Sequence, residues 1–300
     1  WHASGEKGDI FRDILDAFIK KLGPFYNIRW ELIKSSNYGI PQNRPRVFIV
    51  GLHKDLKYLE TLDNVKRSYH EIREKGFAVM DGLLPQPNEM ENAPNLEDLL
   101  NDLVDDGYGD NGFETKYYLT DPITHIQKQF RVKKSNPDNY MKKGEPLTEQ
   151  VYSRHKTKTV EKFTYMIKNK QSILANGSIP EHFKTKKFSQ RVLPPRWENG
   201  SGPWMTATSL PDDYVHYSQP RSLTVREWAR LQTFPDWYQF KGKRTTGGIR
   251  RAGRPGENIH YRELPKYTQI GNAVPVKLAE AIGKHFVSIL KKNKKSRLKR

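Results

Sequence analysis

The fold is decided by the stretch SSNYGIPQNRPRVFIVG, residues 35–51. Asn37, Gly39 and Pro41 predict a tight turn, because these residues tolerate or pre-set the backbone angles that a turn requires. The apolar, mostly β-branched run Val47–Val50 that follows predicts a buried strand. The stretch therefore predicts a polar loop at the mouth of a strand.

Three polar side chains, Gln42, Arg44 and Arg46, alternate along this stretch. A strand places side chains two residues apart on one face, so all three are expected to point the same way. Such a group suits an electron-rich ligand. A surface turn with solvated arginines explains the pattern equally well, and both interpretations stay open at this point.

The composition and charge of the chain indicate its kind of partner and exclude some kinds of chemistry. The 300 residues carry a formal charge of +18, and seven of the last ten are basic, so an anionic partner is expected and nucleic acid is the first candidate. The chain has no cysteine, which excludes a disulfide, a thiolate metal site and a thiol nucleophile within it. No apolar run is long enough to predict a membrane span, and no signal-like start is present. We expect a cytoplasmic, DNA-associated protein.

Local patterns predict the elements around the opening stretch. Apolar residues at helical spacing predict a helix over residues 10–22, and residues 30–33 predict a short strand. Together with the turn and the strand after it, they form a fragment of an α/β sheet. Residues 96–103 predict a short amphipathic helix. Near the C-terminus, a helix is expected to open at residues 269–275 and to bury Leu278, Ile282, Phe286 and Ile289.

Charge changes sign in the middle of the chain. Residues 91–114 carry eight acids and no base, which favours a solvated loop that avoids DNA. Residues 116–170 carry thirteen bases against five acids, interleaved with aromatic residues, a pattern that suits a nucleic-acid surface. Residues 183–217 are rich in proline and glycine and predict irregular loops. Thr224-Val225-Arg226-Glu227 then predicts a capping box at the start of a helix.

Three stretches taken together resemble one family. YGIPQNRPRVFIVG (38–51), PRSLTVREWARLQTFPDWY (220–238) and YTQIGNAVPVKLAEAIG (267–283) resemble the last three conserved motifs of DNA cytosine-5 methyltransferases. The resemblance implies an α/β fold: the C-terminal part of an S-adenosylmethionine-dependent, Rossmann-like methyltransferase fold plus a smaller, irregular target recognition domain. It implies part of the catalytic domain at 1–105, the recognition domain at 106–262, and a C-terminal helix with a basic tail at 263–300.

What the resemblance lacks is also informative. The family's Gly-rich cofactor loop, its Pro-Cys nucleophile and its Glu-Asn-Val motif have no counterpart in this sequence. The family reaction needs a thiolate to attack carbon 6 of cytosine, and a chain without cysteine cannot supply it. We therefore expect the C-terminal part of such an enzyme, inactive alone, with S-adenosylmethionine bound mainly by residues outside it. Its expected partners are double-stranded DNA and an N-terminal catalytic half, in the same longer chain or as a separate subunit. The start at Trp1 favours a fragment.

The resemblance also assigns roles. Arg46 would hydrogen-bond the carbonyl oxygen of a flipped cytosine, with Arg44 and Gln42 bracing the loop as the other catalytic residues. Asn272 and Ala273 would approach the cofactor, Ala273 only through its backbone, because many family members carry serine there.

Three further residues near the family's base-reading loops are expected DNA contacts: Thr206, Thr208 and His216. Arg226, Glu227 and Arg230 lie on the capped helix and are expected to be structural. The histidines show no metal-ligand spacing, so no metal is expected.

Two other functions stay open. The chain could be a stand-alone DNA-binding or specificity protein without catalysis. It could also be part of an RNA cytosine methyltransferase, although the long span 116–209 favours DNA. A restriction-modification setting is expected for the enzyme, whereas the recognised sequence and a cognate endonuclease cannot be read from the residues.

Overall fold

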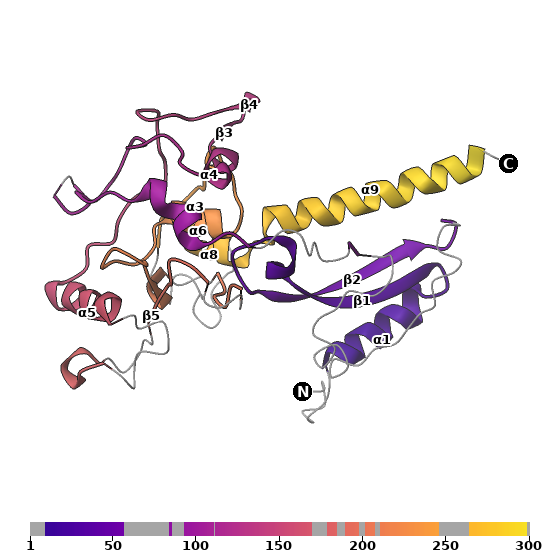
Figure 1. The fold of residues 1–300 in the computed structure, drawn as a ribbon. Coiled ribbons are helices and arrows are strands. Elements are labelled where there is room, and N and C mark those ends of the chain that lie inside the picture. The colour runs from indigo at the N-terminus through magenta and orange to yellow at the C-terminus, as the bar shows by residue number, and fades with distance from the viewer. Residues whose placement is uncertain are drawn as a thin grey trace.

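The structure is a computed structural model that describes residues 10–56, 84–85, 93–110, 112–169, 179–184, 190–197, 202–207, 211–245 and 264–298. Within these residues the elements fall into two parts (Figure 1). The part that we call the ribbon lobe contains α1 (Ile10–Leu22), β1 (Tyr26–Lys34), the 3-10 turn η1 (Ser35–Tyr38), β2 (Pro45–His53) and α9 (Val276–Leu298). The remaining elements form the irregular lobe. The described residues as a whole have a mixed α/β fold.

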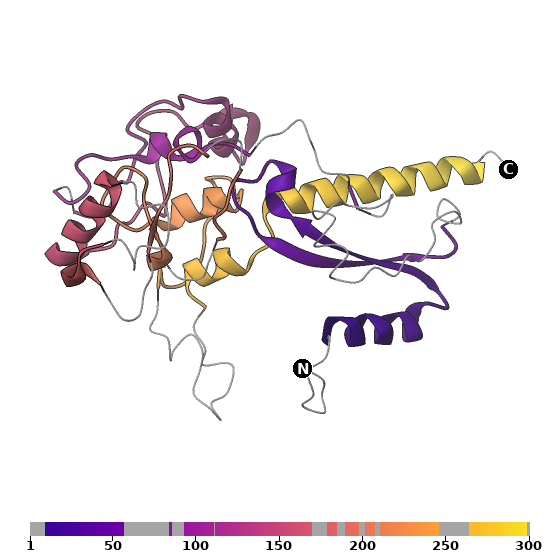
Figure 2. The same ribbon diagram turned by 60° about the horizontal axis from the view of Figure 1, so that its bottom comes forward.

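The ribbon lobe is a two-stranded antiparallel ribbon between two helices. Tyr26 pairs with His53 at one end of the β1–β2 ribbon and Lys34 with Pro45 at the other. Figures 1 and 2 place α1 on one side of the ribbon and α9 on the other. The α9 side holds a core of Ile33, Tyr38, Ile40, Leu84 and Leu278, with Phe48, Val50, Ile282 and Phe286 packed against it.

The helix and the turn follow the sequence patterns, but the strand is not buried as predicted. The predicted helix over residues 10–22 is confirmed, and β1 is longer than the predicted strand at 30–33. Val47 and Ile49 are 38% and 37% exposed. The reason is that β2 pairs only with β1 among the described residues, and alternate side chains face away from the α9 core.

The irregular lobe is built from short elements. They are α3 (Leu96–Leu100), η3 (Asn101–Leu103), α4 (His125–Phe130), β3 (Val132–Lys133), β4 (Asn136–Tyr140), α5 (Thr157–Lys168), η5 (Glu181–Phe183), β5 (Arg191–Val192), η7 (Pro211–Asp213), β6 (Tyr214–Val215), α6 (Val225–Leu231) and α8 (Lys266–Asn272). The described strands form three two-stranded sheets: β1–β2 and β3–β4 antiparallel, and β5–β6 parallel. The irregular character predicted for residues 183–217 is confirmed in their described part.

Helix α6 lies at the centre of this lobe, and all seven of its residues are buried. The predicted capping box is present: the Thr224 hydroxyl accepts a hydrogen bond from the Glu227 backbone N–H, and the Glu227 carboxylate accepts one from the Thr224 N–H. Trp228 packs in one apolar core with Leu96 and Leu99 of α3 and Ile270 of α8. The amphipathic helix predicted at 96–103 is confirmed as α3 followed by η3.

Buried arginines of this lobe are paired with buried carboxylates. Arg230 donates to Asp102 (2.5 Å to Oδ1) and to Asp236 (2.6 Å to Oδ2). Arg131 donates from Nε to Asp102 at 2.8 Å, and its side chain and that of Asp102 are fully buried. Burial raises the pKa of Asp236, but Arg230 and Arg226 outweigh it, so the pKa is lowered overall. The described part of residues 91–114 is therefore only partly the solvated acidic loop that the charge pattern predicted. Asp106, Asp110 and Glu114 are exposed, whereas Asp102 is buried and neutralised by arginines from two distant segments.

Four of the aromatic residues interleaved with bases over 116–170 also differ from expectation, whereas Tyr117 is 56% exposed. Tyr118, Phe130, Tyr152 and Phe163 are at most 4% exposed and belong to the core, so they cannot stack on nucleic acid. Sequence alone cannot separate an aromatic residue between two surface lysines from one that turns inward, because both give the same local pattern.

The C-terminal helix begins later than predicted. Residues 269–272 belong to α8, which ends at Asn272, and α9 begins at Val276 directly after Pro275. The break follows from the proline, which has no N–H to continue α8. Leu278 and Ile289 are buried as expected. None of the described helices is long and apolar enough to cross a membrane.

Candidate functional site at the junction of the lobes

The loop between η1 and β2 lies where the two lobes meet. Gly39 ends η1 with φ of 70°, a left-handed conformation that glycine adopts without steric cost. The hydroxyl of Ser35 donates to the carbonyl oxygen of Arg44 at 3.0 Å, and the N–H of Gln42 donates to that of Ile40 at 2.7 Å. These bonds fix the loop before the strand begins at Pro45. We call this loop, together with 205–207, 231–233 and 270–276, the junction.

Gln42 is fully buried and joins two segments of the irregular lobe to the loop. Its Nε2 donates to the carbonyl oxygen of Leu231 at 3.1 Å and to Oε1 of Gln232 at 2.5 Å. Its Oε1 accepts from the N–H of Ala207 at 3.0 Å. The side-chain amide therefore uses both its donor and its acceptor inside the junction.

Arg44 is also buried and points into the same place. Its Nη1 donates to the carbonyl oxygens of Ala207, at 2.8 Å, and of Gly271. Its Nε is buried and has no hydrogen-bond partner among the described residues. Burial, and then the nearby charge of Arg46, lower the pKa of Arg44 to about 10, so it stays charged near neutral pH.

Arg46 is separated from these two side chains. It is the second residue of β2, and its side chain is exposed. Its Nη1 donates to the carbonyl oxygen of the preceding residue, Pro45. Partial burial lowers its pKa. The prediction that Gln42, Arg44 and Arg46 share one strand face is therefore wrong, because the strand begins only at Pro45: two of the side chains brace the junction and the third lies at its surface.

The segment proposed for cofactor contact meets the same junction. Arg44 bonds to the carbonyl oxygen of Gly271, immediately before Asn272, and the Nε2 of Gln232 donates to the carbonyl oxygens of Ile270 (2.7 Å) and Ala273 (3.1 Å). The Ala273 N–H already donates to Gln269 and Ile270. Asn272 is exposed, so its amide is the group of this segment that faces outward. Sequence reasoning missed Gln232, whose only signal is an amide that directly follows the capped helix.

The expected DNA-contact residues have different environments. The Thr206 hydroxyl donates to the carbonyl oxygen of Asn43 at 2.6 Å, so it braces the loop. His216 is 0% exposed, and its Nδ1 accepts from the N–H groups of Ser218 and Gln219. A buried imidazole has no surface to offer DNA, so this expectation is wrong for His216 in the structure. Thr208 and residues 246–263 lie outside the described residues.

The chemistry that the junction can perform is limited to binding and orientation. Arg46 and Asn272 offer hydrogen-bond donors at the surface, while Gln42, Arg44 and Gln232 hold the backbone beneath them. Over the described residues, no group of three or more His, Asp or Glu side chains lies together as a metal site would require. With no cysteine in the sequence, a covalent step through a thiolate needs a group from elsewhere.

Comparison with known proteins gives a consistent result. A family model described as C-5 cytosine-specific DNA methylase matches residues 3–288. The Type II methyltransferase M.DdeI of Desulfomicrobium norvegicum is 27% identical over 285 residues, which is 92% of this chain and 57% of that protein. The Type II methyltransferase M.BspRI of Lysinibacillus sphaericus is 26% identical over 92% of this chain and 46% of its own length. The chain thus spans about half the length of these relatives.

A solved structure is similar in fold. A crystal structure described as a DNA modification methyltransferase encoded within a prophage of Escherichia coli matches with a TM-score of 0.55 and 18% sequence identity. The match covers 95% of this chain and 66% of that one. At this identity the likeness concerns the fold alone.

Proposed function

Because the family model covers residues 3–288, this chain belongs to the C-5 cytosine-specific DNA methylase family, and we propose that its 300 residues are the target-recognition and C-terminal part of a DNA cytosine-5 methyltransferase. The reaction is methyl transfer from S-adenosylmethionine to carbon 5 of a flipped cytosine within a specific double-stranded sequence. The observation that carries the proposal is the junction, which ties the three family-like stretches together through Gln42, Arg44 and Gln232.

A second, cysteine-bearing portion completes the enzyme in this proposal. The 300 residues contain no thiol, and they span about half of the relatives named above. That portion, in the same longer chain or a separate subunit, supplies the thiolate and most of the cofactor site.

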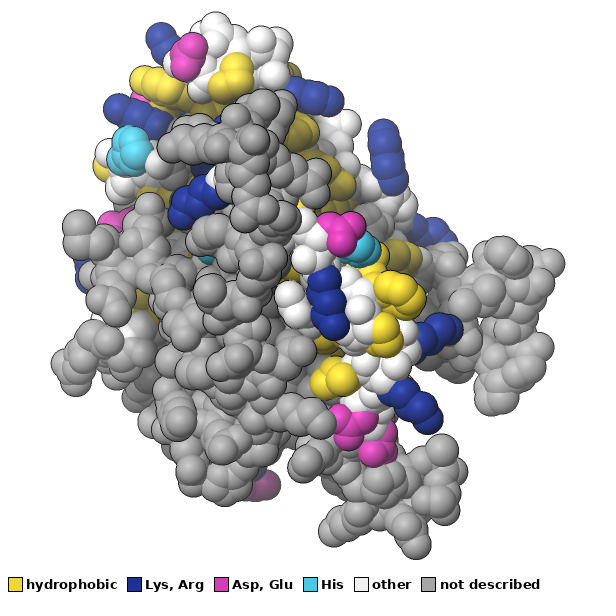
Figure 3. Space-filling view, turned by 90° about the vertical axis from the view of Figure 1, so that its right-hand side faces the viewer, with side chains coloured by type: hydrophobic (Ala, Val, Ile, Leu, Met, Phe, Trp, Pro, Cys, Tyr) yellow, Lys and Arg dark blue, Asp and Glu magenta, His cyan; other side chains and the backbone are white. Residues whose placement is uncertain are grey.

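The ribbon lobe offers a surface for this portion. Ile14, Phe18, Val47 and Ile49 are between 37% and 45% exposed, and a cavity of 260 Å³ lies between α1 and the ribbon. In Figure 3, hydrophobic side chains lie at the surface on this end of the molecule, beside lysine and arginine side chains. Exposed apolar surface of this kind favours a protein contact.

Within the complete enzyme, we assign Arg46 to the cytosine carbonyl oxygen. It is the exposed arginine at the surface of the junction, and a charge-assisted hydrogen bond there would hold the ring as its charge shifts. Gln42 and Arg44 hold the loop. S-adenosylmethionine supplies the methyl group, and the exposed amide of Asn272 is the group of this chain that we assign toward it. Ala273 is less suited to a backbone contact, since its N–H is used in closing α8.

The domain division is proposed with two shifts. Because Leu96 and Leu99 pack in the core around Trp228, the recognition domain begins before α3 rather than at residue 106. Because Ile270 lies in the same core, the domain includes α8 rather than ending at residue 262, and α9 with the basic tail follows. The relatives are Type II methyltransferases, which supports a restriction-modification setting and association with cellular DNA.

The test measures tritiated-methyl transfer to DNA by the purified 300 residues, alone and mixed with a polypeptide that carries the Gly-rich and Pro-Cys segments of the family. We expect no transfer by the chain alone and transfer with the added polypeptide. Methylation by the chain alone would overturn the proposal. Methylation of transfer RNA but not of DNA by the mixture would favour an RNA enzyme, and sequence-specific DNA binding with no transfer by any mixture would favour a specificity protein.

A further inference from the structure

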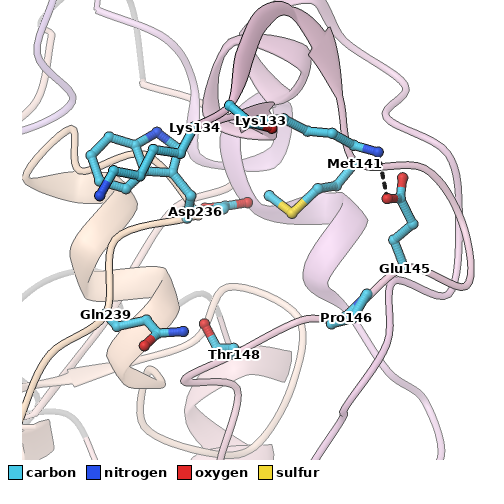
Figure 4. A pocket seen from close by; sticks show the side chains of 10 residues that line it. Lys133, Lys134, Met141, Glu145, Pro146, Thr148, Asp236 and Gln239 are labelled. Carbon is cyan, nitrogen blue, oxygen red and sulfur yellow. Dashed lines mark ion pairs between the residues drawn. The ribbon is translucent and has the colours of Figure 1, made fainter.

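A groove of 660 Å³ lies in the irregular lobe between the β3–β4 hairpin and the segment after α6. Its walls include the indole of Trp237, the thioether of Met141, and the polar side chains of Ser135, Thr148 and Gln239. Figure 4 shows Met141 pointing into the space, with Gln239 and Thr148 on the opposite rim. The volume lies within the range of small-ligand sites.

Most charged groups of this groove are already paired. Lys133 is paired with Glu145 at 2.6 Å (Figure 4), and the buried Asp236 accepts hydrogen bonds from Arg230. Lys134 is exposed and has no carboxylate partner among the described residues; its Nζ lies 5.4 Å from the centre of the Trp237 ring. The groove therefore combines an aromatic wall, neutral hydrogen-bonding groups and one available cation at the rim.

We propose that this groove binds one unpaired nucleotide of a single-stranded nucleic acid, with the base on Trp237 and the phosphate at Lys134. The site goes beyond the proposed methyl transfer and does not depend on it. Trp237 is 37% exposed, so part of the indole is open to a ligand. A base offers a flat apolar face to the indole and polar edges to Gln239, Ser135 and Thr148. Each part of the base therefore has a chemically suitable partner in the groove.

Base stacking on Trp237 is expected to be stronger than the cation–π contact of Lys134 with the same ring, so a base can replace the lysine there. Stacking of a base on an aromatic side chain strengthens binding about 5- to 150-fold. An exposed cation–π contact strengthens an interaction only about 2- to 5-fold. A base that displaces Lys134 from the ring gains the larger factor, and the displaced ammonium becomes available to the phosphate.

Other ligands fit less well. In a duplex, base faces are covered by their neighbours, so a paired base cannot reach the indole. An acidic peptide would bring several carboxylates to a groove in which Lys133 is already bound to Glu145, so that Lys134 is the cation left for them among the described lining residues. A neutral base inside and a single phosphate at the rim need only that one cation.

The experiment measures binding of fluorescein-labelled (dT)6 to the 300-residue chain by fluorescence anisotropy at low salt. Trp237→Ala is expected to weaken binding about tenfold, and Trp237→Phe less than about threefold, because phenylalanine keeps a ring. Phe25→Ala is the matched control, since Phe25 is a 60% exposed aromatic in the other lobe and should change binding less than about twofold. A duplex probe should respond to Trp237→Ala by less than about twofold as well.

A charge test uses Lys134→Glu against Lys158→Glu, an exposed lysine of α5 with the same change in net charge. Only the first is expected to weaken (dT)6 binding strongly, and neither exposed side chain supports the core. Equal losses for Trp237→Ala and Phe25→Ala, or for (dT)6 and the duplex, would overturn the proposal. Displacement of (dT)6 by a glutamate-rich peptide but not by thymidine monophosphate would also overturn it and indicate a peptide site.

Discussion

Gln42 and Gln232 share a hydrogen bond of 2.5 Å although they stand 190 positions apart in the sequence. The same two amides also bind Leu231, Ala207, Ile270 and Ala273, so that four segments of backbone meet on two side chains. Both amides are fully buried. The orientation of the loop before β2 relative to the end of α8 is therefore set by amide hydrogen bonds in an apolar setting, where a lost partner is costly.

Gln232→Ala is expected to destabilise the chain by about 2–4 kcal/mol, because it removes the buried amide that donates to the carbonyl oxygens of Ile270 and Ala273 and that accepts a hydrogen bond from Nε2 of Gln42. The free energy of unfolding in urea measures the effect. Gln269→Ala is the matched control: its amide also donates to two backbone carbonyl oxygens, but both bonds are exposed, so water replaces them at a cost below about 0.5 kcal/mol. Equal losses of unfolding free energy in the two variants would mean that the buried hydrogen bonds of Gln232 stabilise the chain no more than exposed ones do.

Substitution of Arg44 is expected to lower the stability of the chain, whereas substitution of Arg46 is expected to lower the activity of the complete enzyme. Arg44→Ala removes buried bonds to Ala207 and Gly271 and should cost about 1–3 kcal/mol of unfolding free energy. Arg46→Ala changes an exposed side chain, so the free energy of unfolding should stay within about 0.5 kcal/mol. In the complete enzyme, Arg46→Ala should lower the methylation rate about 30- to 1000-fold with little loss of DNA affinity, most of which comes from phosphates.

The control for that prediction is Arg46→Lys, which keeps the charge and removes the planar fork. Full activity in the lysine variant would reduce the requirement to charge alone. A near-normal rate in the alanine variant would make Arg46 an ordinary solvated side chain of the turn.

The buried ion pairs make Arg230 a position with a large expected effect. Arg230→Met removes the cation between Asp102 and Asp236 and leaves two buried carboxylates with weaker compensation, which should cost about 3–5 kcal/mol of unfolding free energy. Arg196→Met removes an exposed cation that contacts Glu97 and Asp98 and should cost less than about 1 kcal/mol. Urea midpoints at unchanged slope compare the two. Similar small losses would show that Arg131 and Arg226 suffice.

Local chemistry was readable from the sequence. The helix at 10–22 follows from apolar spacing, the turn at Gly39 from the residues that favour turns, and the capping box of α6 from Thr224 and Glu227. Each of these features depends on residues at most a few positions apart. The family-like stretches also identified the segments that meet at the junction.

Pairings between distant segments were not readable. Asp102 meets Arg230 across 128 positions, and nothing in either local sequence marks the pair. The burial of Tyr118 and Phe163 and the exposure of Val47 depend likewise on what packs against them. For the same reason Gln232, a single amide at the C-cap of α6, gave no signal of its role, and His216 was expected at a surface that it does not reach.

The basic tail gives a test of DNA binding by charge. Deleting residues 291–300 removes seven bases and should weaken binding to all DNA sequences alike. The slope of log affinity against log salt should become shallower by about 0.9 for each phosphate that the tail no longer neutralises, as measured by anisotropy at several salt concentrations. A changed sequence preference after the deletion would mean that the tail reads bases.

His216 should make stability depend on pH between pH 6.5 and 4.5. Burial, and then the charge of Arg221, lower its pKa to about 3 from the ordinary value of 6.5, and its Nδ1 is occupied as an acceptor for two backbone N–H groups. Below pH 6.5 the unfolded chain binds a proton at this histidine and the folded chain does not. Stability therefore falls as pH falls, by about 1.4 kcal/mol per pH unit from this group.

Glu227, which lies 3.7 Å from His216, contributes in a lower window. Burial raises its pKa, but Arg221 outweighs burial, and the resulting pKa is about 2 against an ordinary value of 4.5, so its contribution is lost only as pH falls below 4.5. His216→Asn keeps an acceptor and cannot titrate, so its unfolding free energy should fall less steeply than that of the wild type between pH 6.5 and 4.5. If His216→Asn kept the wild-type slope over this range, the buried imidazole would have to take up its proton in the folded chain, contrary to its hydrogen bonds.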